Sequence, residues 1–215
     1  MSSDIDKTRN ILIHGLGQIS KDWDTIKNEL ETRGISSVAP DLFDLAKGRK
    51  LDYPTVYQAF SELCESYQDK LNLCGLSLGG LLALNYAIQY PKKINSLVLI
   101  GTPFEIPKGL LKFQNIVFRF MPKAVFQNMG VSKKDFIRLS KSMVDLNFMD
   151  SATALDCPAL ILCGAKDKTN MESAKRFHEA MKNSKLVIVE ASGHEVNKDN
   201  PNELVRVLQD FWADR

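Results

Sequence analysis

The sequence predicts a single α/β domain with a doubly wound, mostly parallel sheet. Its strand-like runs are continuously apolar, as expected for strands buried on both faces. Helix-like stretches with one apolar face separate most of these runs, and this alternation is typical of parallel sheets. A length of 215 residues with 44% hydrophobic residues suits one domain with a sizeable core.

Six apolar runs are the expected strands, taken in chain order. They are Asn10–His14, Ile35–Ala39, Leu71–Cys74, Ser96–Gly101, Ala159–Gly164 and Lys185–Glu190. We therefore expect a sheet of about six strands.

Five stretches between or after these strands are the expected helices. Glycine follows the first one, and proline ends the third and opens the last, which are typical helix boundary signals. The stretches are Asp22–Arg33, Tyr53–Tyr67, Leu78–Tyr90, Met171–Met181 and Asn202–Trp212.

One region breaks the alternation of strands and helices. About fifty residues between Gly101 and Ala159 contain no clear strand and look helical, with interruptions at Pro107 and Pro122. We predict a short helical cap at residues 103–156, inserted into a core formed by residues 1–102 and 157–215. Seven of the eleven phenylalanines fall in this region: Phe104, Phe113, Phe118, Phe120, Phe126, Phe136 and Phe148.

Composition excludes several function classes. The net charge of +2 and the lack of a long basic run give no reason to expect a nucleic-acid partner. No run approaches 18 apolar residues and the first ten residues are polar, so we expect no integral membrane segment, no export and a cytoplasmic location. The four cysteines lack the paired spacing of a zinc site and are expected to be reduced thiols. We expect no metal and no cofactor.

The segment CGLSLGG at residues 74–80 points to a nucleophile. Ser77 lies between an expected buried strand and an expected helix N-terminus, and the flanking glycines let the two backbones approach. The alternative is a serine that merely caps a tightly packed helix. In this context we predict that Ser77 is a catalytic nucleophile at the carboxyl edge of the sheet.

A serine hydroxyl needs a base, and the chain has three histidines. His194 follows the last strand and should lie at the same edge as Ser77, so we predict that it is the base. His178 lies on an amphipathic helix and is expected at the surface. His14 is expected to bond backbone groups in its own loop.

The base needs a carboxylate that orients it. Asp167 follows the strand ALILCG, and the chain order Ser77, Asp167, His194 is that of α/β-hydrolases. Asp167 could instead be only a helix N-cap, and Glu105 is a weaker candidate for the acid. For the oxyanion we expect backbone amides of Leu78, directly after the serine, and of Leu16 in the loop HGLG.

These motifs together resemble the α/β-hydrolase superfamily, in its small carboxylesterase-like branch. The ordered set covers nearly the whole chain: HGLG at 14–17, APD at 39–41, GLSLGG at 75–80, NYAIQYP at 85–91, GAKD at 164–167, and GHE with PNELVRVLQDFW at 193–212. The resemblance implies the α/β-hydrolase fold and a triad of Ser77, Asp167 and His194. The family's first two antiparallel strands are expected to be absent. We also expect Gly15, Trp23 and Phe104 to contact substrate.

The sequence thus predicts a serine hydrolase that cleaves a carboxylic ester or thioester of a small apolar substrate through an acyl-enzyme on Ser77. An acyltransferase or a cofactor-free carbon–carbon hydrolase or lyase would use the same triad. A ligand-binding protein that keeps the triad without turnover is a third alternative. The phenylalanines of the cap could line an apolar pocket or simply pack the cap onto the body. The oligomeric state is open.

Overall fold

A computed structural model of the chain describes residues 8–103, 118 and 121–213. Its centre is a six-stranded sheet in the order β2-β1-β3-β4-β5-β6, and all neighbouring strands run parallel. The strands are β1 (Thr8–Ile13), β2 (Ser37–Val38), β3 (Lys70–Leu76), β4 (Ile94–Ile100), β5 (Ala159–Gly164) and β6 (Ser184–Val189). The predicted fold class, a mostly parallel sheet of about six strands, is confirmed.

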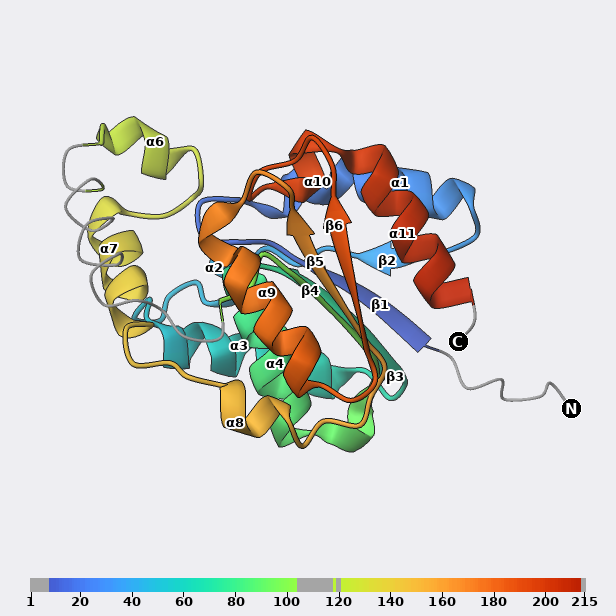
Figure 1. Ribbon diagram of the computed structural model, residues 1–215. Coiled ribbons are helices and arrows are strands. Elements are labelled where there is room, and N and C mark those ends of the chain that lie inside the picture. Colours follow the sequence, from blue (N-terminus) through green and yellow to red (C-terminus); the bar gives the residue numbers. More distant parts are fainter. Residues whose placement is uncertain (1–7, 104–117, 119–120, 214–215) are drawn as a thin grey trace, which may run out of the picture.

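Helices cover both faces of this sheet (Figure 1). The longer ones are α1 (Asp24–Thr32), α3 (Tyr53–Ser66), α4 (Leu78–Gln89), α7 (Lys133–Ser142), α9 (Lys168–Ala180) and α11 (Pro201–Ala213). The short ones are η1 (Ser20–Trp23), α2 (Leu42–Leu45), η2 (Pro91–Lys93), α6 (Lys123–Gln127), α8 (Met149–Ala152) and α10 (Val196–Asp199). The sequence pattern missed α2 and α10, since four residues show no helical periodicity.

The strands bury alternate side chains on opposite faces, which produces two hydrophobic clusters. On β1, Ile11 and Ile13 belong to the cluster under α3, α4 and α9, whereas Leu12 belongs to the cluster under α1 and α11. All three residues are fully buried. This explains why the runs are continuously apolar rather than alternating.

The sheet order places a topological switch point between β1 and β3. The chain leaves β1 toward α1 on one face and leaves β3 into α4 on the other face (Figure 1). Ligands in open α/β sheets bind in the crevice outside the carboxyl ends of strands at such a point. The predicted nucleophile Ser77 directly follows β3, and the loop HGLG directly follows β1.

The described part of the predicted cap is helical. Residues 121–156 contain α6, α7 and α8 beside the sheet domain (Figure 1). The rings of Phe118 and Phe126 both contact Phe136 edge-on, with centroids 5.0 Å apart. Ser142 accepts a hydrogen bond from the backbone N–H of Tyr53 at 2.7 Å, which ties α7 to the start of α3. The exact bounds 103–156 stay a prediction.

Two further findings bear on the sequence expectations. Among the described residues, no helix has the length and apolar character needed to cross a bilayer. All four cysteines are free, and three of them are buried: Cys64, Cys74 and Cys163.

Candidate active site

Ser77 occupies a strained turn between β3 and α4. Its φ of 54° and ψ of −111° lie in a region that non-glycine residues rarely adopt. The backbone N–H of Ser77 donates to Ile100 O at 2.9 Å, which fixes the turn against the end of β4. Leu78 is the first residue of α4, so its N–H has no acceptor within the helix. The conformation is the one expected for a nucleophile held above the edge of the sheet.

Close packing explains the glycines around this serine. A Cβ on Gly75 would lie 2.3 Å from the carbonyl carbon of Gly79. A Cβ on Gly79 would lie 2.2 Å from Ile13 O. Only glycine at both positions lets β1, β3 and α4 approach this closely.

The loop after β1 lies directly beside the serine. A Cβ on Gly15 would come within 3.5 Å of the Ser77 Cβ and 2.7 Å of the Leu76 side chain. Leu16 follows Gly15 in the chain and therefore also lies close to Ser77. Its side chain is half-buried. The assignment of the Leu16 and Leu78 amides as oxyanion donors stays a prediction that this placement favours.

Asp167 and His194 form a hydrogen-bonded pair at the carboxyl ends of β5 and β6. His194 Nδ1 lies 2.7 Å from Asp167 Oδ2. The Asp167 side chain is only 5% exposed, whereas the His194 side chain is 41% exposed. The carboxylate is therefore shielded from water while the imidazole remains accessible. This is the arrangement needed for an acid that orients a base.

The surroundings of Asp167 keep it ionised. Burial alone would raise the pKa of its carboxyl, but hydrogen bonds from His194 and Asn170 and the charge of His194 outweigh that effect. The net result is a pKa below the ordinary value for aspartate. An ionised Asp167 accepts a hydrogen bond from the N–H at His194 Nδ1, which leaves Nε2 free to act as a base.

Gly101 connects the serine turn with the Asp167–His194 pair. A Cβ at this position would lie 3.0 Å from His194 Nδ1 and 3.3 Å from Asp167 Oδ2. Its φ is +52°, a conformation that favours glycine. The preceding residue, Ile100, accepts the hydrogen bond from Ser77 N. The end of β4 thus contacts all three predicted triad positions, so the structure brings them to one rim.

Asn170 belongs to this cluster, and sequence reasoning missed it. Its Nδ2 donates to Asp167 Oδ1 at 3.0 Å and to Oδ2 at 2.8 Å, and it lies 3.2 Å from His194 Nδ1. Asp167 is also the N-cap of α9 and accepts from Asn170 N at 3.2 Å. The pattern of a cap residue with a polar side chain three residues later is the available signal.

The other two histidines have structural roles, as expected. His14 is fully buried, and its Nε2 accepts from Leu42 N at 2.9 Å, so the proton sits on Nδ1, 2.9 Å from Gly15 O. Burial lowers its pKa, with smaller opposing effects from Gly15 and Asp41. His178 is exposed and contacts Ser184.

The predicted substrate contacts have mixed outcomes. Trp23 is fully buried in the cluster under α1 and α11, so its ring offers a substrate no surface and the expectation was wrong. Gly15 lies beside Ser77, and its contact with substrate stays a prediction. Phe104 and Glu105 lie outside the described residues. Among the residues that are described, no group of three or more metal-ligating side chains is present.

Comparisons with known proteins show the family of the chain. The chain matches the α/β-hydrolase fold family over residues 11–146, and it belongs to that family. Lipase 3 of Moraxella sp. (strain TA144) is 26% identical over 90% of this chain and 75% of the lipase. The family resemblance predicted from the motifs is confirmed.

Solved structures show the same fold. A thermophilic esterase from Thermogutta terrifontis has a TM-score of 0.80 and 18% identity, covering 97% of this chain and 90% of the esterase. A serine hydrolase involved in carbazole degradation has a TM-score of 0.77 and 17% identity, covering 98% of this chain and 92% of that one. At these identities the likeness establishes the fold, and the chain is a member of a hydrolase family.

Proposed function

We propose that this protein is a serine hydrolase that cleaves a carboxylic ester or thioester through an acyl-enzyme on Ser77. The observation that carries the proposal is the 2.7 Å Asp167–His194 pair on the same rim as the strained Ser77. The lipase and the esterase among the similar proteins are in keeping with ester chemistry. Free cysteines are in keeping with the cytoplasmic location that we also propose.

Acylation begins with attack by the Ser77 hydroxyl oxygen on the substrate carbonyl carbon. His194 Nε2 takes the hydroxyl proton, and ionised Asp167 stabilises the imidazolium through Nδ1. Backbone amides of Leu16 and Leu78 stabilise the negative oxygen of the tetrahedral intermediate. Collapse of that intermediate breaks the ester bond, and His194 gives its proton to the leaving alcohol or thiol.

Deacylation repeats these roles with water as the nucleophile. His194 takes a proton from water, the hydroxide adds to the acyl carbon, and the proton returns to the Ser77 oxygen as the acid leaves. The sum is one ester and one water converted to one acid and one alcohol. Asn170 helps throughout, because its donors hold Asp167 ionised and in place.

A small apolar acyl or alcohol group is the proposed substrate feature. Support comes from Leu16, an apolar and only half-buried residue of the loop beside the serine. Among the described cap phenylalanines, Phe126 and Phe136 do not add to this argument, because they are almost completely buried and contact one another. Their role in packing the cap is the simpler interpretation.

A fluorophosphonate probe tests the proposal without knowledge of the natural substrate. We expect the probe to label Ser77 at neutral pH, as mapped by mass spectrometry, and Ser77→Ala to abolish labelling. A series of p-nitrophenyl esters of increasing acyl length then measures the size of the pocket. No labelling of the folded protein, or labelling at another serine, would contradict the proposal.

The alternative functions predict different behaviour once Ser77 has been labelled. An acyltransferase would form the acyl-enzyme but release it faster with an added alcohol or thiol than with water. A carbon–carbon hydrolase or lyase would label at Ser77 yet turn over esters poorly. A ligand-binding protein would label slowly and be stabilised by its ligand without turnover.

A further inference from the structure

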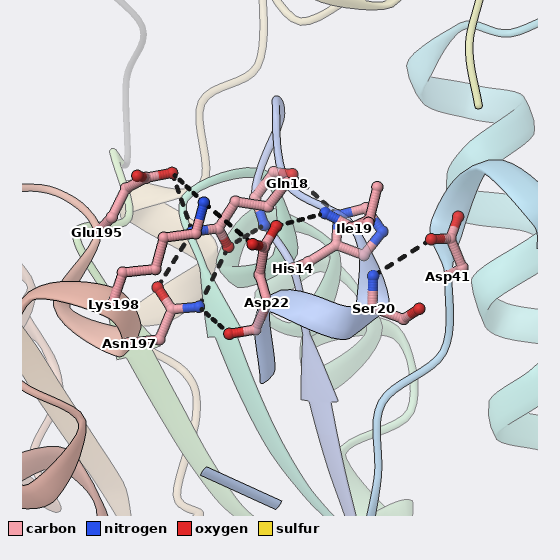
Figure 2. Close-up of polar contacts among 10 residues, drawn as sticks. His14, Gln18, Ile19, Ser20, Asp22, Asp41, Glu195, Asn197 and Lys198 are labelled. Atoms are coloured by element: carbon pink, nitrogen blue, oxygen red, sulfur yellow. Dashed lines mark hydrogen bonds and ion pairs between the residues drawn. The ribbon is translucent and has the colours of Figure 1, made fainter. Parts of the chain in front are cut away.

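The loop that carries Gly15 and Leu16 is linked to the segment after His194 by a buried polar network centred on Gln18. We propose that Gln18 is a positioning residue that sets the loop after β1 relative to the catalytic histidine. This inference rests on the proposed function, because it concerns the placement of one proposed oxyanion donor. Figure 2 shows the network, whose two halves are separated by about 177 residues of sequence.

On the loop side, Gln18 closes the turn that contains the proposed oxyanion donor. Its backbone N–H donates to Gly15 O at 3.2 Å. Its side-chain Oε1 lies 3.5 Å from Gly15 N and accepts there. The peptide groups on either side of Gly15 are therefore both bonded to Gln18. The one before Gly15 is bonded through the Gln18 side chain, and the one after it, which carries the Leu16 amide, through the Gln18 backbone N–H. A shift of Gln18 would move the Leu16 amide.

On the histidine side, the Gln18 amide contacts two residues that follow His194. Nε2 donates to Glu195 Oε1 at 3.0 Å and to Asn197 Oδ1 at 3.1 Å. Asn197 Nδ2 in turn lies 3.4 Å from Gln18 Oε1 and donates to Asp22 O at 3.1 Å. Glu195 is the direct chain neighbour of the proposed base.

An outer ion pair supports the same link (Figure 2). Lys198 Nζ lies 3.1 Å from Asp22 Oδ1 and 3.5 Å from Glu195 Oε1. Asp22 also accepts from Ile19 N at 2.8 Å, within the loop after β1. Lys198 is partly exposed, so its ion pairs are screened by water and contribute less than the buried amides.

Burial is what gives Gln18 this role. Gln18 is 1% exposed and Asn197 is 2% exposed, so neither amide can replace a lost partner with bulk water. A buried amide without its partners is costly, and the network therefore has one preferred geometry. Positioning within a fraction of an ångström matters at an oxyanion site, because donors act on the charge that develops in the transition state.

The test exchanges the two partners. Gln18→Glu places a carboxyl against Glu195, and Gln18→Glu combined with Glu195→Gln restores one amide and one carboxylate in reversed order. We expect the single change to reduce kcat and the rate constant of fluorophosphonate labelling about tenfold, with KM changed less than about twofold. The double change should return both values to within about threefold of wild type.

The pH dependence adds a second readout. The introduced carboxyl would face Glu195, Asp22 and Lys198. In Gln18→Glu the carboxyl groups at positions 18 and 195 would lie within hydrogen-bond distance of each other. As pH rises, both carboxyls ionise and repel, so the rate of Gln18→Glu relative to wild type should fall. A relative rate that does not change with pH would contradict the contact with Glu195.

A matched pair on the protein surface is the control. On the exposed face of α3, Gln58 Nε2 donates to Glu62 Oε1 at 3.1 Å. This is the same amide–carboxylate hydrogen bond, placed away from the rim. Gln58→Glu, alone or with Glu62→Gln, should leave kcat and labelling unchanged. All rates are measured well below the melting temperature of each variant, so that unfolding does not contribute to a lower rate.

The outcomes separate the inference from the proposed function. Absence of labelling at Ser77 in the wild-type chain would overturn the function and the positioning role with it. Normal wild-type labelling together with Gln18 variants that lower only the melting temperature would overturn the positioning role alone. Failure of the exchange to restore kcat would also overturn it.

Discussion

The two ends of the central sheet both hold buried polar clusters, but the clusters differ in kind. Near the amino ends, Asn72 of β3 donates to Asn10 at 2.8 Å and accepts from Asn95 at 2.9 Å and Ser96 at 2.6 Å. At the carboxyl ends, an ionised carboxylate bonds an accessible imidazole on the same rim as a strained serine. The first cluster is neutral and bonded across three strands. The second combines charge, strain and exposure.

This difference teaches where the fold places stability and where it places chemistry. Neutral amides that bridge β1, β3 and β4 hold those strands in register and leave no group to react. The carboxyl rim instead keeps a charged group and an uncommon backbone conformation, which costs stability. We therefore expect changes at the two ends to affect different measurements.

The largest expected effect is at the carboxyl rim. His194→Ala removes the proposed base and should reduce kcat roughly 10⁴-fold or more, because the serine can no longer lose its proton. The melting temperature should change little, since the imidazole is partly exposed. Ester hydrolysis and thermal unfolding measure the two quantities.

His178→Ala is the matched control, because this histidine is exposed on α9. It should leave kcat unchanged. Equal losses in both variants would show that neither histidine is the base.

The next effect is at the amino end. Asn72→Leu removes the residue that joins the neutral cluster and leaves Asn10, Asn95 and Ser96 without this hydrogen-bond partner. The free energy of unfolding should therefore fall by about 2–3 kcal/mol. The kcat of the folded fraction should stay near wild type. Denaturant unfolding monitored by circular dichroism, with kcat measured at low temperature, tests this expectation.

Asn28→Leu, on the exposed face of α1, is the control for the asparagine-to-leucine change. A loss of activity in Asn72→Leu without loss of stability would mean that the two ends are not separated in role.

A smaller effect is expected at Asn170. Asn170→Leu removes two side-chain donors from Asp167, so the pKa of that carboxyl should rise and its hold on His194 should loosen. We expect kcat to fall roughly tenfold, the equivalent of one charge-assisted hydrogen bond. KM should stay constant, because Asn170 is not a proposed substrate contact. Steady-state kinetics measures both.

Thr169→Ala, at the exposed neighbouring position on α9, is the comparison variant. An unchanged kcat in Asn170→Leu would show that backbone capping alone is enough to hold Asp167.

The smallest effect concerns His14, a buried group of the carboxyl rim that takes no part in the proposed chemistry. Burial lowers the pKa of His14 from the ordinary value of 6.5. Just below pH 6.5 the imidazole is therefore protonated in the unfolded chain but still neutral in the folded chain. Stability due to neutral His14 is complete above pH 6.5 and is lost as pH falls below it. His14→Gln should flatten this part of the pH dependence, as followed by melting temperature between about pH 7.5 and 5.

His178→Gln serves as the control here and should keep the wild-type pH dependence. A wild-type profile that is flat below pH 6.5 would contradict the assignment of a neutral, buried His14.

The sequence alone determined the fold class, the strands of the sheet and the positions that we propose for the chemistry. Apolar runs predicted all six strands, and the signal was clearest for the central strands β3, β4 and β5, because burial on both faces leaves little polar alternation. The same logic placed Ser77, Asp167 and His194 after strands β3, β5 and β6, at one edge of a parallel sheet. Gly75 and Gly79 indicated a tight turn between strand and helix, because close backbone contact there requires residues without a Cβ.

Only the tertiary structure decided what packs beside these positions. It buried Trp23 in the core, although we expected this residue to contact substrate. It brought Gln18 to Glu195 and Asn197, and Asn170 to His194. Local patterns carry periodicity, caps and turns, whereas contacts between residues about 177 positions apart depend on how the elements pack, which no local pattern encodes.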